Sequence, residues 1–385
     1  MAIAKAQAVG APRQPHGVVL CRSAAFSSVA PAAAHRAYRI PSAAVAANGD
    51  LLVLAEGRAP RDRPGTRGNL SLCWGQPASL YDWKCYAKDV VIRRSSDQGR
   101  RFGPVEILAA CNSTVFYSNP LVVVRRATGT LWLAYVRCPI PDKIDPSASA
   151  FTQCVQLVRS SPDHGQTWTA EREVPGSFPQ GDGGVGGGLE LASGRMLFPR
   201  NGLGPAISDD GGATRRVAPP LLHRGEAQAA QIQNGSVLMQ MRAGNADGTP
   251  YTYVWVRSDD GGEHFGLPAM HRVPFVPDCP SSITVDDSGQ LLMSHPNPAD
   301  RNLERPLGRR NLTVSAGTFG RDGAVAWRDA VVVFQGPSAY SSLFSLAVWN
   351  KGTNRGVIGV VYEMSSDGKE PLDFEGIQYS AVTTD

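Results

Sequence analysis

The sequence of 385 residues lacks any apolar run long enough to cross a membrane as a helix. It also lacks the CxxC spacing of zinc ribbons and dithiol redox sites, and it contains no GxxxxGK[ST] phosphate-binding loop. The net charge of +4 is small and the basic residues are spread along the chain, so nucleic-acid binding is not indicated. These absences give no support for a nucleotide, a metal ion or another cofactor.

Glycine and proline are abundant instead, with 41 and 29 residues in the chain. Many glycines and prolines suit tight turns between short strands and disfavour long helices. The composition therefore favours an all-β protein. The length would accommodate two or three average domains or one large ring of strands.

The seven cysteines are an odd number, so at least one thiol is free. Cys73 and Cys85 flank a tryptophan-rich loop, and Cys138 and Cys154 flank another loop. A disulfide could bridge either loop, and the spacing alone does not decide between bridged and free thiols.

A hairpin signal recurs six times along the chain. At each place a polar residue and a glycine stand between two apolar stretches, namely at residues 48–49, 128–129, 193–194, 234–235, 288–289 and 351–352. Such strand repeats indicate a β-propeller, because each small twisted sheet buries its faces against its neighbours around a closed ring. We therefore expect an all-β, six-bladed β-propeller over residues 35–385. Residues 1–34 are Ala-rich, and we expect a tail or targeting remnant there that is poorly ordered or packs on the propeller.

A second repeat, the Asp box, has the form SxDxGxTW and lies between the hairpins. It occurs at residues 95–102, 161–168 and 258–265, and a fourth copy at residues 208–214 lacks the aromatic residue. We expect the aspartate to accept backbone N–H bonds of its own turn, the glycine to supply positive φ, and the aromatic ring to pack beneath. These acids are therefore predicted to stabilise turns and not to act in catalysis.

The first hairpin carries charged residues at its open end. Tyr38-Arg39-Ile40-Pro41 precedes a strand of small and β-branched residues, and the returning strand ends at Glu56 and Arg58. A guanidinium is always charged and offers a rigid fork of donors, so an arginine held on a strand is suited to bind a carboxylate. We expect Arg39 to have this function.

The Tyr-Arg-Ile-Pro sequence together with the repeated Asp boxes resembles the sialidase (neuraminidase) superfamily. The resemblance extends from about Tyr38 to Glu363. Through residues 92–99 and 336–343 it is closest to lysosomal-type animal enzymes and their bacterial relatives. It implies a six-bladed β-propeller with the active site at one end of the central axis.

The resemblance also implies a function, that of a retaining exo-α-sialidase. Such an enzyme removes a terminal sialic acid, or a related nonulosonic acid such as Kdn, from sialylated glycans, glycoproteins or gangliosides, and it needs no cofactor. A lysosomal or secreted location is favoured, and a cytoplasmic one stays open.

The family's motifs assign roles to individual positions. Arg39, Arg242 and Arg309 bind the substrate carboxylate, Tyr340 is the nucleophile, Glu226 activates it, Glu363 orients Arg39, and Arg58 contacts the sugar. Arg310 competes with Arg309, because neighbours on a strand face opposite sides and only one can point into the site. Tyrosine suits the chemistry, because the anomeric carbon of a sialic acid carries its own carboxylate and would repel a charged nucleophile.

The general acid is expected at one of two aspartates. The family places it a few residues beyond Arg58 and shortly before the strand that begins at Asp89, but this chain has a longer loop between them. Asp62 keeps the spacing from Arg58, and Asp82 keeps the spacing to the strand. We favour Asp82, because the end of the loop that enters the strand is anchored.

Two other classes of protein would share part of this pattern. A catalytically inactive, lectin-like propeller would keep the Asp boxes and lose the arginine, tyrosine and glutamate positions, all of which are present here. An Asp-box glycosidase for neutral sugars would have no need of the arginines.

Overall fold

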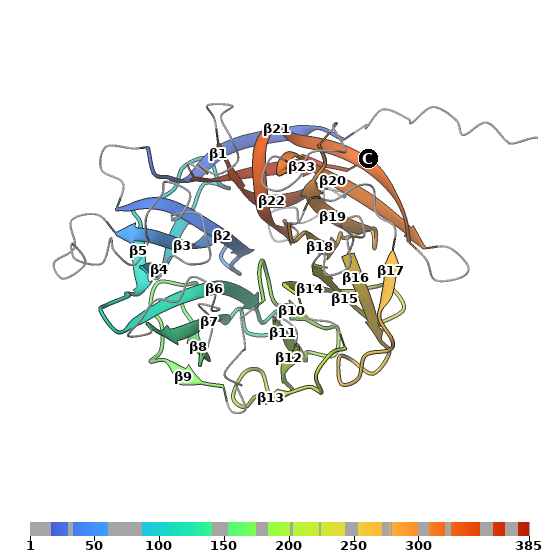
Figure 1. The fold of residues 1–385 in the computed structure, drawn as a ribbon, viewed down its shortest axis with the longest axis horizontal. Helices are drawn as coiled ribbons and strands as arrows, with labels where there is room; N and C mark the ends of the chain where they lie inside the picture. Colours follow the sequence, from blue (N-terminus) through green and yellow to red (C-terminus); the bar gives the residue numbers. More distant parts are fainter. Residues whose placement is uncertain are drawn as a thin grey trace, which may run out of the picture.

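The computed structural model describes residues 17–29, 34–60, 87–140, 153–174, 184–200, 203–222, 225–242, 253–271, 277, 279–298, 308–319, 325–346, 357–365 and 376–384. Every regular element within these ranges is a β-strand. The strands form four four-stranded sheets and one seven-stranded sheet around a common axis (Figure 1). The all-β propeller predicted from the sequence is therefore confirmed.

All four four-stranded sheets are antiparallel and follow chain order. The first contains β2 (His35–Val45), β3 (Leu51–Pro60), β4 (Lys88–Ser95) and β5 (Glu106–Ala109). The second contains β6 (Val115–Val124), β7 (Leu131–Pro139), β8 (Val155–Ser161) and β9 (Arg172–Glu173). The third contains β10 (Leu189–Glu190), β11 (Met196–Arg200), β12 (Leu203–Ser208) and β13 (Arg216–Val217). The fourth contains β14 (Ala227–Gln231), β15 (Val237–Arg242), β16 (Tyr253–Ser258) and β17 (Ala269–His271).

The seven-stranded sheet joins the two ends of the described chain. Its order is β1 (Val19–Ser27), β23 (Gly376–Thr383), β22 (Val357–Met364), β21 (Val325–Ser345), β20 (Arg310–Phe319), β19 (Leu291–Pro296) and β18 (Ser282–Val285). The long β21 pairs with β20 as far as Pro337 and with β22 from Ser338 onward. Because β1 pairs with β23 along its length, the sheet also takes in part of the segment 1–34, for which we expected a tail or targeting remnant, either poorly ordered or packed on the propeller.

The predicted hairpin turns lie between paired strands. The glycines at positions 49, 129, 194, 235 and 289 have φ between 71° and 93°, which glycine adopts without a steric penalty. These turns connect β2 to β3, β6 to β7, β10 to β11, β14 to β15 and β18 to β19. The sixth predicted turn, at residues 351–352, lies outside the described residues, between the paired strands β21 and β22.

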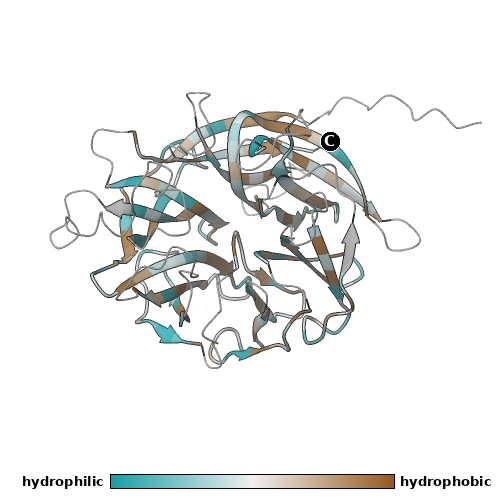
Figure 2. Cartoon of the chain, in the orientation of Figure 1, coloured by the Kyte–Doolittle hydropathy of each residue, from teal (hydrophilic) through white to brown (hydrophobic). Residues whose placement is uncertain are grey.

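The hydrophobic core lies between neighbouring sheets, and apolar residues run along the strands (Figure 2). Each sheet packs against the next through its own cluster, so the ring is closed by side-chain packing. Residues from neighbouring sheets that share a cluster include Leu54 and Leu133, Trp132 and Phe198, Leu197 and Met239, Trp255 and Met293, and Val53 and Tyr379. Removing such apolar surface from water is the main stabilising contribution to a fold of this kind.

The Asp boxes have the structure expected of them. In the second copy the Ser161 hydroxyl donates to Asp163 at 2.7 Å, and Asp163 accepts the backbone N–H of Thr167 at 2.9 Å. The same bonds recur in the copies that begin at Ser95, Ser208 and Ser258. The side-chain and backbone bonds of Thr167 hold the pKa of Asp163 well below its usual range. The predicted turn-stabilising function of these aspartates is confirmed.

Arg215 occupies the aromatic position of the fourth Asp box. Its guanidinium carbon lies 4.5 Å from the centroid of the Trp132 ring and 5.0 Å from that of Phe198, so the planar group packs where the other copies place a ring. Two of its nitrogens, Nε and Nη2, are buried without a hydrogen-bond acceptor. Burial and the nearby Arg172 lower the pKa of Arg215 to about 10.

We expect Arg215→Phe to raise the melting temperature. The change removes two unsatisfied buried N–H groups and restores a ring against Trp132, and together these effects are worth on the order of 1 kcal/mol. Thermal unfolding followed by calorimetry would measure the shift, with Arg216→Phe as the control because Arg216 is exposed and paired with Glu263. An unchanged or lower melting temperature in Arg215→Phe would contradict the prediction.

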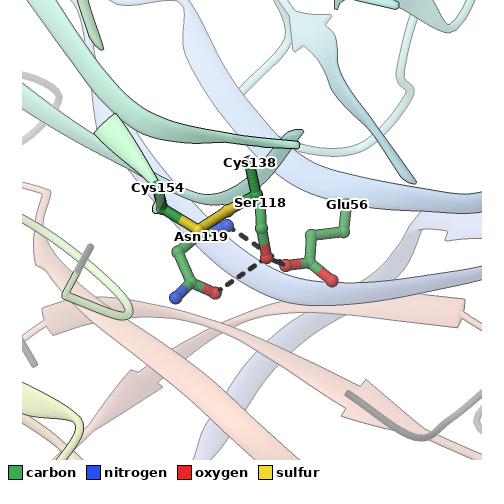
Figure 3. Close-up of a disulfide and its surroundings, with 5 residues drawn as sticks. All are labelled: Glu56, Ser118, Asn119, Cys138 and Cys154. Atoms are coloured by element: carbon green, nitrogen blue, oxygen red, sulfur yellow. Dashed lines mark hydrogen bonds between the residues drawn. A yellow bond between two sulfur atoms is a disulfide. The ribbon is translucent and has the colours of Figure 1, made fainter. Parts of the chain in front are cut away.

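One of the two proposed disulfides lies within the described residues. Cys138 and Cys154 are bonded across the loop between β7 and β8, close to Ser118 and Asn119 (Figure 3). Cys21 and Cys279 are free thiols. Cys73 and Cys85 lie outside the described residues. Within the described part of the chain, we find no helix with the length and apolarity needed to span a membrane.

Candidate active site

Arg39 lies at an irregularity in β2. The pairing of β2 with β3 shifts between Arg39 and Ser42, and Ile40 has a positive φ of 55°. A β-branched residue at positive φ is strained, so the surrounding structure must hold this conformation in place. Glu363 of β22 supplies that support.

The carboxylate of Glu363 forms a bidentate ion pair with Arg39. Arg39 donates from Nε to Oε1 at 3.0 Å and from Nη2 to Oε2 at 2.9 Å. Glu363 also accepts the backbone N–H groups of Ile40 at 2.8 Å and of Tyr340 at 3.3 Å. Burial alone would lower the pKa of Arg39, but Glu363 raises it above its usual value. The fork of Arg39 is therefore charged and fixed before any ligand arrives.

Tyr340 of β21 lies between arginines from distant parts of the chain. The guanidinium carbons of Arg39 and Arg309 are 5.0 Å and 5.7 Å from the centroid of its ring. Its hydroxyl donates to Glu226 Oε1 at 2.5 Å and accepts from Arg242 Nη1 at 3.3 Å. Arg242 Nη1 also donates to Glu226 Oε2 at 2.6 Å. Three predicted arginines, the predicted nucleophile and its predicted activating glutamate thus meet in one place.

The charge around Tyr340 favours a neutral phenol in the resting protein. Burial and the negative charge of Glu226 raise its pKa, whereas Arg242, Arg309 and Arg39 oppose that rise, and the pKa remains above its usual value. A phenol that is protonated at rest and bonded to a carboxylate can lose its proton as its oxygen forms a bond.

The structure distinguishes the two candidates for the third arginine by burial. Arg309 is buried beside Tyr340, with 5% of its surface exposed, and its backbone carbonyl accepts the N–H of Ser338 at 2.9 Å. Arg310 is only half-buried and begins β20. Arg309 is therefore the residue that the fold brings to the tyrosine.

Arg58 is buried and paired with Glu56, a residue for which the sequence predicted no role. Glu56 Oε2 accepts from Arg58 Nε at 2.9 Å and from Nη2 at 2.6 Å. Glu56 lies directly opposite Arg39 in the pairing of β2 with β3. The available signal was the Glu-Gly-Arg sequence at the end of the hairpin, where alternate residues place both charges on one side of the strand.

The floor beneath Tyr340 is apolar. Ile40, Val185, Cys279 and Ala339 form one buried cluster with the tyrosine. Burial raises the pKa of the Cys279 thiol to about 11. Further along the inner strands, residues 43–45, 122–124 and 343–345 line a cavity of about 510 Å³ on the propeller axis. The site therefore lies towards one end of the inner strands.

Two of the predicted site residues cannot be placed. Asp62 and Asp82, the candidates for the general acid, lie outside the described residues. Among the residues that the structure does describe, no group of three or more histidine, cysteine, aspartate or glutamate side chains could hold a metal ion.

The site is suited to an anionic ligand. Arg39, Arg242 and Arg309 surround Tyr340, and Glu363 and Glu226 pair with the first two of them. Arg58 and Glu56 form a further buried pair, with Glu56 opposite Arg39 in the sheet. Fixed guanidinium groups bind a carboxylate with geometric selectivity. The arrangement can therefore hold a carboxylate next to a tyrosine and its proton acceptor.

A ring of antiparallel sheets with Asp boxes at its turns and an arginine-rich site at one end is a propeller of the Asp-box class. Residues 86–355 match the family model of the BNR repeat-like domain, which is more than half of the chain. The protein therefore belongs to the BNR repeat-like family within the sialidase superfamily, and the resemblance found in its sequence is confirmed.

Known proteins of this kind are similar over different lengths. A sialidase from Micromonospora viridifaciens is 27% identical over 267 residues, which are 61% of this chain and 37% of that protein. The match thus spans little more than a third of that relative.

The structure of an intramolecular trans-sialidase from Ruminococcus gnavus in complex with oseltamivir carboxylate has a TM-score of 0.69 at 16% identity, over 94% of this chain and 97% of that one. The Hadza microbial sialidase Hz136 has a TM-score of 0.66 at 20% identity, over 90% of this chain and 66% of that one. These two structural similarities support the propeller fold.

Proposed function

We propose that the protein is a retaining exo-α-sialidase. The observation that carries the proposal is the pair of Tyr340 and Glu226, joined at 2.5 Å and flanked by Arg39, Arg242 and Arg309. The sialidases among the similar proteins support the same reading. Sialylated glycans, including glycoproteins and gangliosides, are the proposed substrates, with N-acetylneuraminic acid or Kdn as the terminal sugar.

In the proposed first step the arginines hold the carboxylate of the sugar. The Tyr340 oxygen forms a bond to the anomeric carbon while the bond from that carbon to the leaving oxygen breaks. The phenolic proton passes to Glu226, and an aspartic acid, Asp82 or Asp62, protonates the leaving group. A neutral phenol avoids the repulsion that a carboxylate nucleophile would meet at this carbon.

In the second step water replaces the tyrosine. The aspartate, now ionised, takes a proton from the water as its oxygen attacks the anomeric carbon, and Glu226 returns the proton to the departing phenolate. Two displacements at the same carbon retain its configuration.

We also infer that the propeller has six blades. The seven-stranded sheet then counts as two blades that share β21, with β18 to β20 and the first part of β21 in one, and the rest of β21 with β22, β23 and β1 in the other. This division gives every blade four strands and assigns one hairpin to each.

A secreted or lysosomal location is part of the proposal. The bond between Cys138 and Cys154 supports it, because disulfides persist in oxidising compartments.

A fluorogenic substrate tests the proposed activity. We expect the purified protein to release 4-methylumbelliferone from its α-N-acetylneuraminide, and proton NMR to detect the α-anomer of the sugar as the first product. Binding of the sugar without turnover would instead identify a lectin-like propeller, and turnover of neutral glycosides alone would identify a different glycosidase. A first product in the β-configuration would contradict retention.

A further inference from the structure

The irregularity that presents Arg39 occurs a second time, in the neighbouring sheet. Tyr38-Arg39-Ile40-Pro41 of β2 has a counterpart in Tyr117-Ser118-Asn119-Pro120 of β6. In both strands the pairing shifts at this place, between Arg39 and Ser42 and between Ser118 and Leu121. The residue before proline has positive φ in both, 55° at Ile40 and 52° at Asn119.

Each of these two irregularities is held by a buried glutamate from the preceding sheet. Glu363 of β22 accepts the N–H of Ile40, and Glu56 of β3 accepts the N–H of Asn119 at 3.1 Å (Figure 3). Each glutamate also binds an arginine through two nitrogens, Arg39 in the first case and Arg58 in the second. The same arrangement, a buried glutamate that binds both a strand irregularity and an arginine, thus occurs twice around the ring.

Every acceptor position of Glu56 is in use. Oε2 accepts both bonds from Arg58, and Oε1 accepts the N–H of Asn119 and the hydroxyl of Ser118. The side chain is fully buried. Burial alone would raise the pKa of Glu56, but Arg58 and Lys88 lower it to about 2, so the carboxylate is ionised at any ordinary working pH.

We propose that Glu56 is a positioning residue, which fixes the guanidinium of Arg58 and the backbone of Asn119 beside the candidate active site. The effect on substrate rests on the proposed function, in which Arg58 contacts the sugar. In the proposed function, Arg58 held by Glu56 donates a hydrogen bond to the sugar outside its carboxylate. The substrate carboxylate is left to Arg39, Arg242 and Arg309.

The Glu56→Gln variant tests this function without a change of size. An amide has only one acceptor oxygen, whereas both oxygens of Glu56 accept bonds, so the NH₂ group must face donors of Arg58 or of Asn119 and Ser118. We expect a crystal structure of the variant to show Arg58 or the segment 118–119 displaced. Unchanged positions of both would overturn the proposal, and this result does not depend on what the protein catalyses.

Kinetics test the consequence for the substrate. A contact made equally in the ground state and in the transition state acts on KM, so we expect Glu56→Gln to raise KM for the aryl sialoside on the order of 10-fold, with kcat within a few-fold of the unmodified enzyme. An unchanged KM would overturn the effect on substrate, and a fall in kcat alone would place Glu56 in the chemistry.

Glu190 provides a matched control. Its carboxylate also joins neighbouring sheets, accepting from the N–H of Arg126 at 2.9 Å and from Arg126 Nε at 2.8 Å at the turn between β6 and β7, and neither residue belongs to the predicted site. We expect Glu190→Gln to leave KM unchanged. An equal rise in KM in Glu56→Gln and Glu190→Gln would show that Glu56 contributes only to the stability of the fold. If the unmodified protein shows no turnover, the proposed function fails, while the crystal structure of Glu56→Gln still decides the positioning role.

Discussion

The Tyr340→Phe variant is expected to lose at least about 10³-fold in kcat on the aryl sialoside, because loss of a nucleophile or of the proton transfer that activates it has effects of this order or larger. The phenyl ring keeps the contacts with Arg39, Arg309 and the apolar floor. Binding of an unsaturated sialic acid analogue, measured by calorimetry, should therefore stay within about 10-fold of the unmodified protein.

A second tyrosine in the chain serves as the control. Tyr135 also donates to a glutamate, with 2.6 Å between its hydroxyl and Glu171 Oε1, and burial and Glu171 raise its pKa as well. It lies in the second sheet on β7, and the predicted arginines do not surround it. We expect Tyr135→Phe to retain activity. Full activity in Tyr340→Phe would remove the tyrosine from the mechanism.

The Arg39→Met variant is expected to lose both stability and affinity. The change leaves Glu363 buried without its partner, and breaking a buried ion pair in this way costs about 3–5 kcal/mol. The substrate carboxylate also loses a charged, pre-oriented donor, so we expect kcat/KM to fall at least about 10²-fold.

The double variant Arg39→Met, Glu363→Gln separates the two effects. The double variant has no unpaired buried carboxylate at position 363. We therefore expect chemical denaturation to show that part of the lost free energy of unfolding is restored, whereas kcat/KM stays low. Recovery of activity in the double variant would mean that Arg39 contributes only to folding.

The sequence predicted those features that depend on neighbouring residues. The turn at Asn48-Gly49 and the Asp163 turn are set by bonds within a few residues, and the structure has them as expected. The approach of Arg39, Arg242, Arg309, Glu226 and Tyr340 could be predicted only through the family resemblance, because no local pattern records which strands become neighbours.

The features that the sequence did not reveal depend on contacts between sheets. In the sequence, Glu56 is only a charged residue at the end of a hairpin. Its bond to the backbone of Asn119 exists because β6 of the next sheet packs beside it. Arg215 replaces an aromatic residue, which is understandable only once Trp132 and Phe198 are in place. The extra strand β1 became visible only through its pairing with β23.

The pairing of β1 with β23 also has a consequence for biosynthesis. Val19 lies opposite Val382, and Arg39 bonds to Glu363 across 324 positions of the chain, so neither contact can form on the ribosome until β22 and β23 have emerged. Such non-local contacts fold late and slowly. A nascent chain that ends before β22 and β23 would thus have neither a closed ring nor an oriented arginine, and the ability to bind a carboxylate would report that translation had passed these two strands.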